Sequence, residues 1–185
     1  MTFYIRNKSQ NIQFYVHKNT QMKQRYHNSQ KEVKGMNTTE LREQFLVENF
    51  MNNGEINFTY SHYDRVIVGG AVPTQQSLAL ENFAMLRAEY FLERREMGVI
   101  NIGGSGSIVV DGKTFSLNKK DCLYIGRGSQ SVSFSSESAA EPALFYILST
   151  DLVRSIHNKT RSYLASILSQ KSILCPLGLN NCTTY

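Results

Sequence analysis

The chain has 185 residues, 41% of them hydrophobic, so it can bury one sizeable core but is short for two full domains. No stretch has the apolar length of a membrane-spanning helix, and the first twenty residues lack the continuous apolar region of a signal peptide. Three cysteines without a CxxC pair suit a reducing compartment. These features predict a soluble, cytoplasmic protein with no membrane partner.

The formal net charge of +5 is concentrated at the two ends of the chain. Residues 1–34 carry seven basic and one acidic side chain and residues 151–185 carry four and one, whereas residues 35–150 carry nine and thirteen. A short basic stretch without a pattern is typical of a solvated tail. We therefore expect no nucleic-acid partner, and a nucleic-acid binder with a basic arm is the weakest of the alternatives.

The N-terminal third predicts a tail followed by one short helix. Residues 1–35 are polar, rich in Asn, Gln and Lys, and are expected to form a poorly ordered basic tail, with Met22 and Met36 as possible later start positions. Asn37 and Glu40 have the spacing of a helix N-cap and its reciprocal acid, which predicts a short helix over residues 39–50.

From residue 56 onward the apolar residues recur mainly with a period of two. Residues 56–61 and 65–70 read as strands, residues 75–81 as a possible further strand, and residues 82–89 as a short helix. Beyond residue 98, short apolar runs are separated by polar or glycine-containing turns; the runs are GVINI, SIVV, KTFSL, CLYI, QSVSF and PALFYILS. Short strands without intervening helices predict an all-β antiparallel sandwich or barrel.

Two of the glycine-containing turns in this part of the chain separate its first three apolar runs. Asp111-Gly112, between alternating apolar runs, predicts a tight hairpin. Gly104-Ser105-Gly106 lacks the third glycine and the following helix of a dinucleotide-binding loop, so it is also interpreted as a hairpin turn. Cys122, inside the run CLYI, is expected to be a small core residue.

The order of strands and turns resembles the cupin barrel, a jelly-roll fold. Glu96, six further residues and Gly103 match the second half of the first cupin metal motif, but Tyr90, Phe91 and Leu92 stand where its histidines belong. In the second motif Ser131 takes the place of the imidazole. Zinc needs about four N, O or S donors, so we expect no metal in this barrel. Glu96 is expected instead to join a charge cluster with Glu93, Arg94 and Arg95.

A more specific resemblance rests on several segments taken together: LREQFLVENF, YSHYDRVIVGGAVP, YFLERREMGVINIGGSGSIVVDG, DCLYIGRGSQSVSF and PALFYILST. They are similar to the N-terminal half of the 5-keto-4-deoxyuronate isomerase family, which has two cupin domains. The resemblance implies isomerisation of 5-dehydro-4-deoxy-D-glucuronate to 3-deoxy-D-glycero-2,5-hexodiulosonate in pectin degradation, a homo-oligomer, and zinc held by three histidines and a glutamate of the second cupin.

The resemblance also predicts the domain organisation. Residues 36–150 would form the N-terminal cupin-like domain, whereas residues 151–185 do not match the family. We hypothesise that a frameshift or premature stop replaced the metal-binding half, and that residues 1–21 are an upstream extension. The alternative is a non-catalytic cupin module for oligomerisation or sugar binding.

Within this half, six side chains have chemistry suited to an isomerase of an anionic sugar; they are His62, Asp64, Arg65, Arg94, Arg95 and Glu96. If their strand continues, His62 and Asp64 point to the same side and can form an acid/base pair, with a surface hydrogen bond as the alternative. Arg65 would contact the substrate carboxylate or pair structurally. Arg94 and Arg95 alternate sides, so at most one of them faces a pocket.

Overall fold

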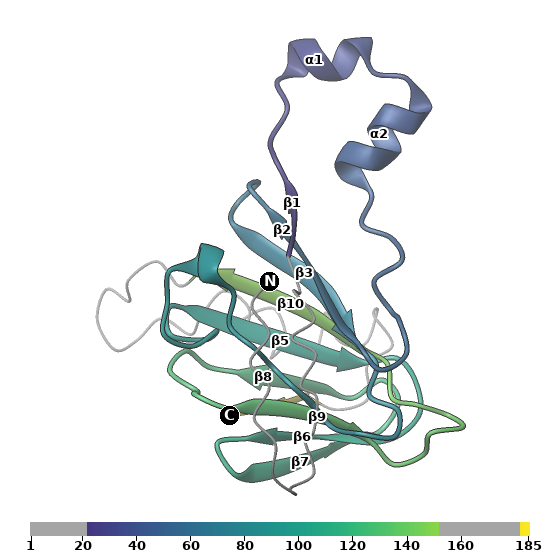
Figure 1. Ribbon diagram of the computed structural model, residues 1–185, viewed down its shortest axis with the longest axis vertical. Coiled ribbons are helices and arrows are strands. Elements are labelled where there is room, and N and C mark those ends of the chain that lie inside the picture. Colours follow the sequence, from purple (N-terminus) through teal and green to yellow (C-terminus); the bar gives the residue numbers. More distant parts are fainter. Residues whose placement is uncertain (1–21, 152–181) are drawn as a thin grey trace, which may run out of the picture.

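In the computed structural model, residues 22–151 and 182–185 are described, and they form two packed β-sheets with two short helices at one end (Figure 1). The larger sheet contains, in spatial order, β1 (Lys23–Arg25), β2 (Ile56–Ser61), β3 (Val66–Ala71), β10 (Phe145–Asp151), β5 (Arg95–Asn101), β8 (Cys122–Ile125) and β11 (Cys182–Thr184). The smaller contains β4 (Leu78–Ala79), β9 (Val132–Ser136), β6 (Gly106–Val110) and β7 (Lys113–Leu117).

Strand pairing confirms the predicted all-β sandwich. Neighbouring strands are antiparallel except at the two edges of the larger sheet, where β1 lies parallel to β2 and β11 parallel to β8. The strands predicted at residues 56–61 and 113–117 have the predicted bounds. β11 lies within the segment 151–185, and β10 ends at Asp151, one residue beyond the predicted domain boundary.

One core fills the space between the two sheets. It includes Met97 and Phe145 from the larger sheet and Ile108 and Phe134 from the smaller, each without exposed surface. Cys122 is buried, as predicted. Because side chains alternate along a strand, the residues of β5 that share a face with Met97 point into this core.

The two glycine-containing turns differ in kind. At Asp111 and Gly112 both φ angles are positive, at 46° and 83°, which is the backbone of a two-residue hairpin and confirms the turn between β6 and β7. The prediction of a hairpin at Gly104 is wrong, because β5 and β6 belong to different sheets and this segment connects them. A Cβ at Gly104 would lie 2.2 Å from the Glu141 carbonyl oxygen, so glycine allows the close approach.

The helices lie at one end of the molecule, beyond the edge of the larger sheet (Figure 1). The predicted helix is present as α2 (Thr38–Phe45), shorter than expected, and Asn37 and Glu40 form the predicted reciprocal cap. A second helix, α1 (Gln30–Gly35), has the same kind of cap and lies in the segment expected to be a tail. A single 3-10 turn, η1 (Ala84–Leu86), stands where the other short helix was predicted. No helix of the described residues is long and apolar enough to cross a membrane.

Candidate functional site

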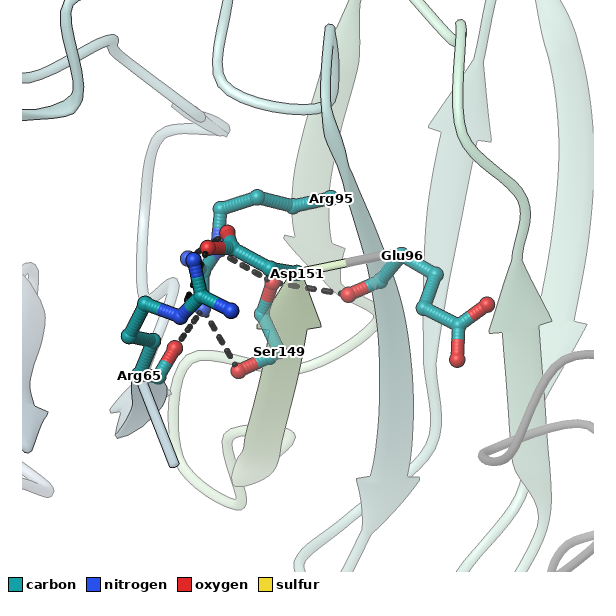
Figure 2. Close-up of polar contacts among 5 residues, drawn as sticks. All are labelled: Arg65, Arg95, Glu96, Ser149 and Asp151. Carbon is teal, nitrogen blue, oxygen red and sulfur yellow. Dashed lines mark hydrogen bonds and ion pairs between the residues drawn. The ribbon is translucent and has the colours of Figure 1, made fainter. Parts of the chain in front are cut away.

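Arg95 is the centre of a polar cluster at one end of the sandwich (Figure 2). It is the first residue of β5 and shares the core-facing side of that strand with Met97, and only 3% of its surface is exposed. The antiparallel register places Arg95 opposite Asp151 of β10. The two strands therefore bring a buried guanidinium and a carboxylate together.

The Arg95 guanidinium donates to several acceptors at once. Nε donates to Ser149 Oγ at 3.2 Å, Nη1 to Asp151 Oδ1, and Nη2 to the carbonyl oxygens of Arg65 at 2.6 Å and of Ser149 at 3.0 Å. The Tyr60 ring centroid lies 5.8 Å from Cζ. A guanidinium has five N–H donors, so this set uses most of them. Arg95 is thereby fixed as a structural centre.

The electrostatics of the cluster explain why the pairing with Asp151 is needed. Burial is the largest influence and lowers the pKa of Arg95, whereas Asp151 and then Tyr60 raise it and the nearby charge of Arg65 lowers it. Arginine remains protonated in proteins. The carboxylate of Asp151 therefore compensates a charge that burial would otherwise destabilise.

Arg65 approaches the same carboxylate from the solvent side. Its Nε lies 3.6 Å from Asp151 Oδ2, and 61% of its side chain is exposed. The structural pairing expected as one of two alternatives is thus observed. Contact with a substrate carboxylate stays a prediction.

The acid/base hypothesis required His62 and Asp64 to lie on one continuous strand. In the structure they do not. β2 ends at Ser61, and Asp64 and Arg65 have φ angles of 53° and 54°, so the chain turns here. The His62 ring stacks on Tyr26 with centroids 4.3 Å apart, and its Nε2 lies 3.3 Å from the acceptor Gln24 Oε1. His62 thus belongs to the contact between β1 and β2.

Arg94 and Glu96 flank Arg95 but have different surroundings. Arg94 is exposed and pairs with its neighbour Glu93 at 3.3 Å. Glu96 is 1% exposed, and Tyr124 donates to its Oε2 at 2.9 Å. Figure 2 shows Arg95 and Glu96 extending to opposite sides of β5. Glu96 is therefore separated from the core-facing side, and the expected single cluster of Glu93, Arg94, Arg95 and Glu96 is wrong.

A small cavity of about 40 Å³ lies elsewhere, beside β1 and β2. Its lining includes Met22, Asn57, Phe58 and Phe83. None of the six candidate residues borders it. Its volume is sufficient for water rather than for a sugar acid.

No family model matches the sequence. A 4-deoxy-L-threo-5-hexosulose-uronate ketol-isomerase of Formosa agariphila is 52% identical over 128 residues, 69% of this chain and 46% of that protein. A protein of the same name from Halalkalibacterium halodurans is 50% identical over the same length. This chain belongs to the ketol-isomerase family. It spans about half the length of the curated relatives it matches.

Solved cupin domains are distantly similar to this ketol-isomerase family member. The cupin domain of Schizosaccharomyces pombe Cnp3 has a TM-score of 0.40 and 13% identity, covering 52% of this chain and 64% of that one. A cupin domain of an Enterobacter cloacae transcriptional regulator has a TM-score of 0.42 and 12% identity, covering 54% and 95%.

The residues described here do not fit the zinc that the family resemblance implies. Phe91 and Leu92, at the positions expected for histidines, are core residues only 3% and 1% exposed. Ser131 donates through Oγ to Asp111 at 3.2 Å and so stabilises the start of β9. Within residues 22–151 and 182–185, no three His, Cys, Asp or Glu side chains are grouped to hold a metal ion. No metal-dependent step is therefore assigned to the described residues of this chain.

Sequence reasoning did not identify Ser149, Asp151 or Tyr124 as partners in the candidate site. Asp151 had been assigned to the unmatched tail, although it lies opposite Arg95 in the register of β10 and β5. A signal was present in the sequence, because the apolar alternation of β10 places Ser149 and Asp151 on the side of Phe145 and Ile147. Polar residues that continue a core-facing pattern indicate a buried polar partner.

Proposed function

We propose that this chain forms the half of a uronate ketol-isomerase that does not hold the metal. The complete enzyme would convert 5-dehydro-4-deoxy-D-glucuronate to 3-deoxy-D-glycero-2,5-hexodiulosonate, moving a proton between adjacent carbons through an enediol. Zinc, held by residues of the relatives that lie outside the matched part, would polarise the oxygens of the substrate. The identity of about 50% to proteins of that name is the observation on which the proposal depends.

The surroundings of the charged residues support a division of roles. Arg95 has its donors directed to Asp151, Ser149 and the Arg65 carbonyl oxygen, so it would position strands rather than bind substrate. Arg65 has an exposed guanidinium with one ion pair at 3.6 Å. Because the substrate is an anionic sugar acid, Arg65 is the residue of this half that we assign to its carboxylate.

Further properties of the intact enzyme belong to the same proposal. We infer a homo-oligomer acting in the cytoplasm, in pectin degradation, with a small-molecule uronate as its substrate. The described part of this chain supplies a close-packed sandwich core.

An isomerase assay with complementary halves tests the proposal. The chain would be fused to the part of the Formosa agariphila relative that lies outside the match, and assayed with and without added zinc. We expect isomerisation by the zinc-loaded fusion and none by this chain alone. Activity of this chain alone at the level of the fusion would contradict the proposal, because the site would then lie within it.

A matched pair of arginine variants in the active fusion tests the assignment of Arg65. Arg65→Gln should raise KM by about tenfold or more with a smaller change in kcat, because a charge-assisted contact to the bound substrate is lost. Arg94→Gln removes an equally exposed guanidinium that pairs with Glu93, and should leave both constants unchanged. Equal kinetics for the two variants would exclude Arg65 from substrate binding.

A non-catalytic cupin module is the second candidate function. The observation that favours it is the apolar filling of the sandwich, in which core residues occupy the expected histidine positions. Two results together would favour this alternative. The fusion would bind zinc but remain inactive, and a uronate would bind to this chain alone.

A further inference from the structure

Arg65 stands at a backbone position that disfavours arginine. It follows Asp64 in the turn between β2 and β3, and these two residues have φ angles of 54° and 53°. The turn between β6 and β7 also contains an aspartate with positive φ, Asp111, but there the next residue is Gly112. Glycine adopts positive φ without a steric penalty, whereas the Cβ of other residues lies too close to the following carbonyl oxygen. Arginine therefore strains the turn between β2 and β3.

The buried cluster around Arg95 holds this strained residue in place. Arg95 Nη2 donates to the carbonyl oxygen of Arg65 at 2.6 Å, which fixes the backbone of the turn. Asp151 accepts from Arg95 Nη1 through Oδ1, and its Oδ2 lies 3.6 Å from Arg65 Nε (Figure 2). One carboxylate thus bridges two guanidinium groups. Strained residues that are held by their surroundings occur frequently at ligand sites, so the function of Arg65 was examined from its contacts.

The three side chains connect the interior of the sandwich to its surface. Their exposed fractions are 4% for Arg95, 28% for Asp151 and 61% for Arg65. Among the residues that the structure describes, Arg65 forms its ion pair through Nε, and a guanidinium carries four further N–H donors on its two Nη atoms. A planar guanidinium binds a carboxylate through two parallel hydrogen bonds. Arg65 therefore has an inner edge fixed by Asp151 and an outer edge directed to an anionic ligand.

We propose that Arg95 and Asp151 are positioning residues, which hold Arg65 in the orientation that binds the carboxylate of the substrate. The inference rests on the proposed function, in which Arg65 contacts that carboxylate. Ordering a long side chain before binding reduces the conformational entropy that is lost when the ligand binds. Two positive charges and one negative charge leave the group with a net charge of +1, which complements the single carboxylate of a sugar acid.

Nuclear magnetic resonance of the full chain tests the positioning without an assay of activity. In a chain with isotopically labelled arginine, the Nε–Hε signal of Arg65 is assigned by its loss in Arg65→Lys. We expect an ordered Arg65 side chain in the native chain and, in Asp151→Asn, an order parameter below about 0.6, which is typical of a flexible group. An Arg65 side chain that is equally mobile in both proteins would overturn the proposal.

Asp121 provides the matched control for this measurement. It is a buried carboxylate at the opposite end of β5, where its carbonyl oxygen accepts from the Asn101 amide at 3.0 Å. Asp121→Asn makes the same chemical change away from Arg65 and should leave its order parameter unchanged. Circular dichroism confirms that each variant is folded. Asp151→Glu keeps the charge beside Arg95 and should preserve more of the order of Arg65 than Asp151→Asn does.

Kinetics of the zinc-loaded fusion test the consequence for substrate binding. Asp151→Asn and Arg65→Gln should each raise KM about tenfold with a smaller change in kcat, and the double variant should raise it no further, because both act on one contact. Asp121→Asn should leave KM unchanged. An unchanged KM in Asp151→Asn, or single effects that multiply in the double variant, would exclude the positioning role. An inactive fusion would instead contradict the proposed function, and the order parameter of Arg65 would still decide whether Asp151 orients it.

Arg65→Gly separates the strain of the turn from the charge of the side chain. Glycine accepts the positive φ, so Arg65→Gly should melt at a higher temperature than Arg65→Ala, although both lack the guanidinium. In the active fusion both variants should raise KM as Arg65→Gln does. A lower melting temperature for Arg65→Gly than for Arg65→Ala would show that the turn is not strained and would remove the reason for holding it through Arg95.

Discussion

The sandwich and the segment of residues 23–50 that carries α1 and α2, here called the arm, obtain their order from different interactions. In the sandwich, side chains of two sheets bury each other, and Phe134 has no exposed surface. In the arm, no residue from 23 to 50 is buried, and the helices begin at the reciprocal caps of Ser29 with Glu32 and Asn37 with Glu40. Local hydrogen bonds thus define where the helices begin, whereas burial supplies most of the stability of the fold.

The largest expected effect comes from truncating the same residue type in each region. Phe134→Ala should lower the free energy of unfolding by about 3–5 kcal/mol, because it removes a fully buried ring and leaves a cavity. Phe45→Ala, at 49% exposure, should lower it by less than about 1 kcal/mol. Urea denaturation at low protein concentration measures both. Similar losses for the two variants would mean that the arm contributes to the core of a single chain.

Neighbouring arginines allow a second comparison, between a buried and an exposed ion pair. Asp151→Asn should destabilise the protein by about 3 kcal/mol, because it leaves the buried charge of Arg95 without its carboxylate. Arg94→Gln removes the exposed pair with Glu93 and should change stability by less than about 0.5 kcal/mol. Chemical denaturation of both variants provides the measurement. If Asp151→Asn were as mild as Arg94→Gln, the cluster at Arg95 would contribute little to stability.

The contrast between local hydrogen bonds and long-range burial also explains which features could be predicted from the sequence. Strands 56–61 and 113–117, the Asp111-Gly112 hairpin and the cap at Asn37 follow from local patterns, and the structure contains all of them. The segment at Gly104 was misread as a hairpin because local pattern does not reveal which sheet a strand joins. α1 escaped prediction because its short sequence, QKEVKG, lacks an apolar period, although Ser29 and Glu32 have the capping spacing.

The candidate site was predictable only in part. The alternation of Arg94 and Arg95 was correct, and the pairing of Arg65 was one of two stated alternatives. The partner Asp151 depends on the register between β5 and β10, which joins residues 56 positions apart. Sequence spacing does not give such long-range register. The roles of His62, Asp64 and Glu96 in catalysis stay predictions.

The smallest expected effect is a pH dependence of stability. It arises where the arm rejoins the sandwich. Tyr146 of β10 packs against Phe50, the last residue of the arm, with ring centroids 6.0 Å apart. Burial raises the pKa of Tyr146 above its ordinary value. Above the ordinary tyrosine pKa of about 10, the unfolded chain loses this proton before the folded chain does. Stability should therefore fall as the pH rises through that value.

The matched variant Tyr146→Phe isolates this contribution, because it keeps the ring and removes the ionisable hydroxyl. The free energy of unfolding, measured by urea denaturation from neutral pH to above pH 10, should fall less steeply for Tyr146→Phe than for the native chain. Below the ordinary tyrosine pKa both proteins should show the same pH dependence, since the hydroxyl is then neutral in both states. Equal slopes at alkaline pH would mean that Tyr146 ionises as readily in the folded chain as in the unfolded one. In that case the packing between the end of the arm and β10 would be too open to exclude water.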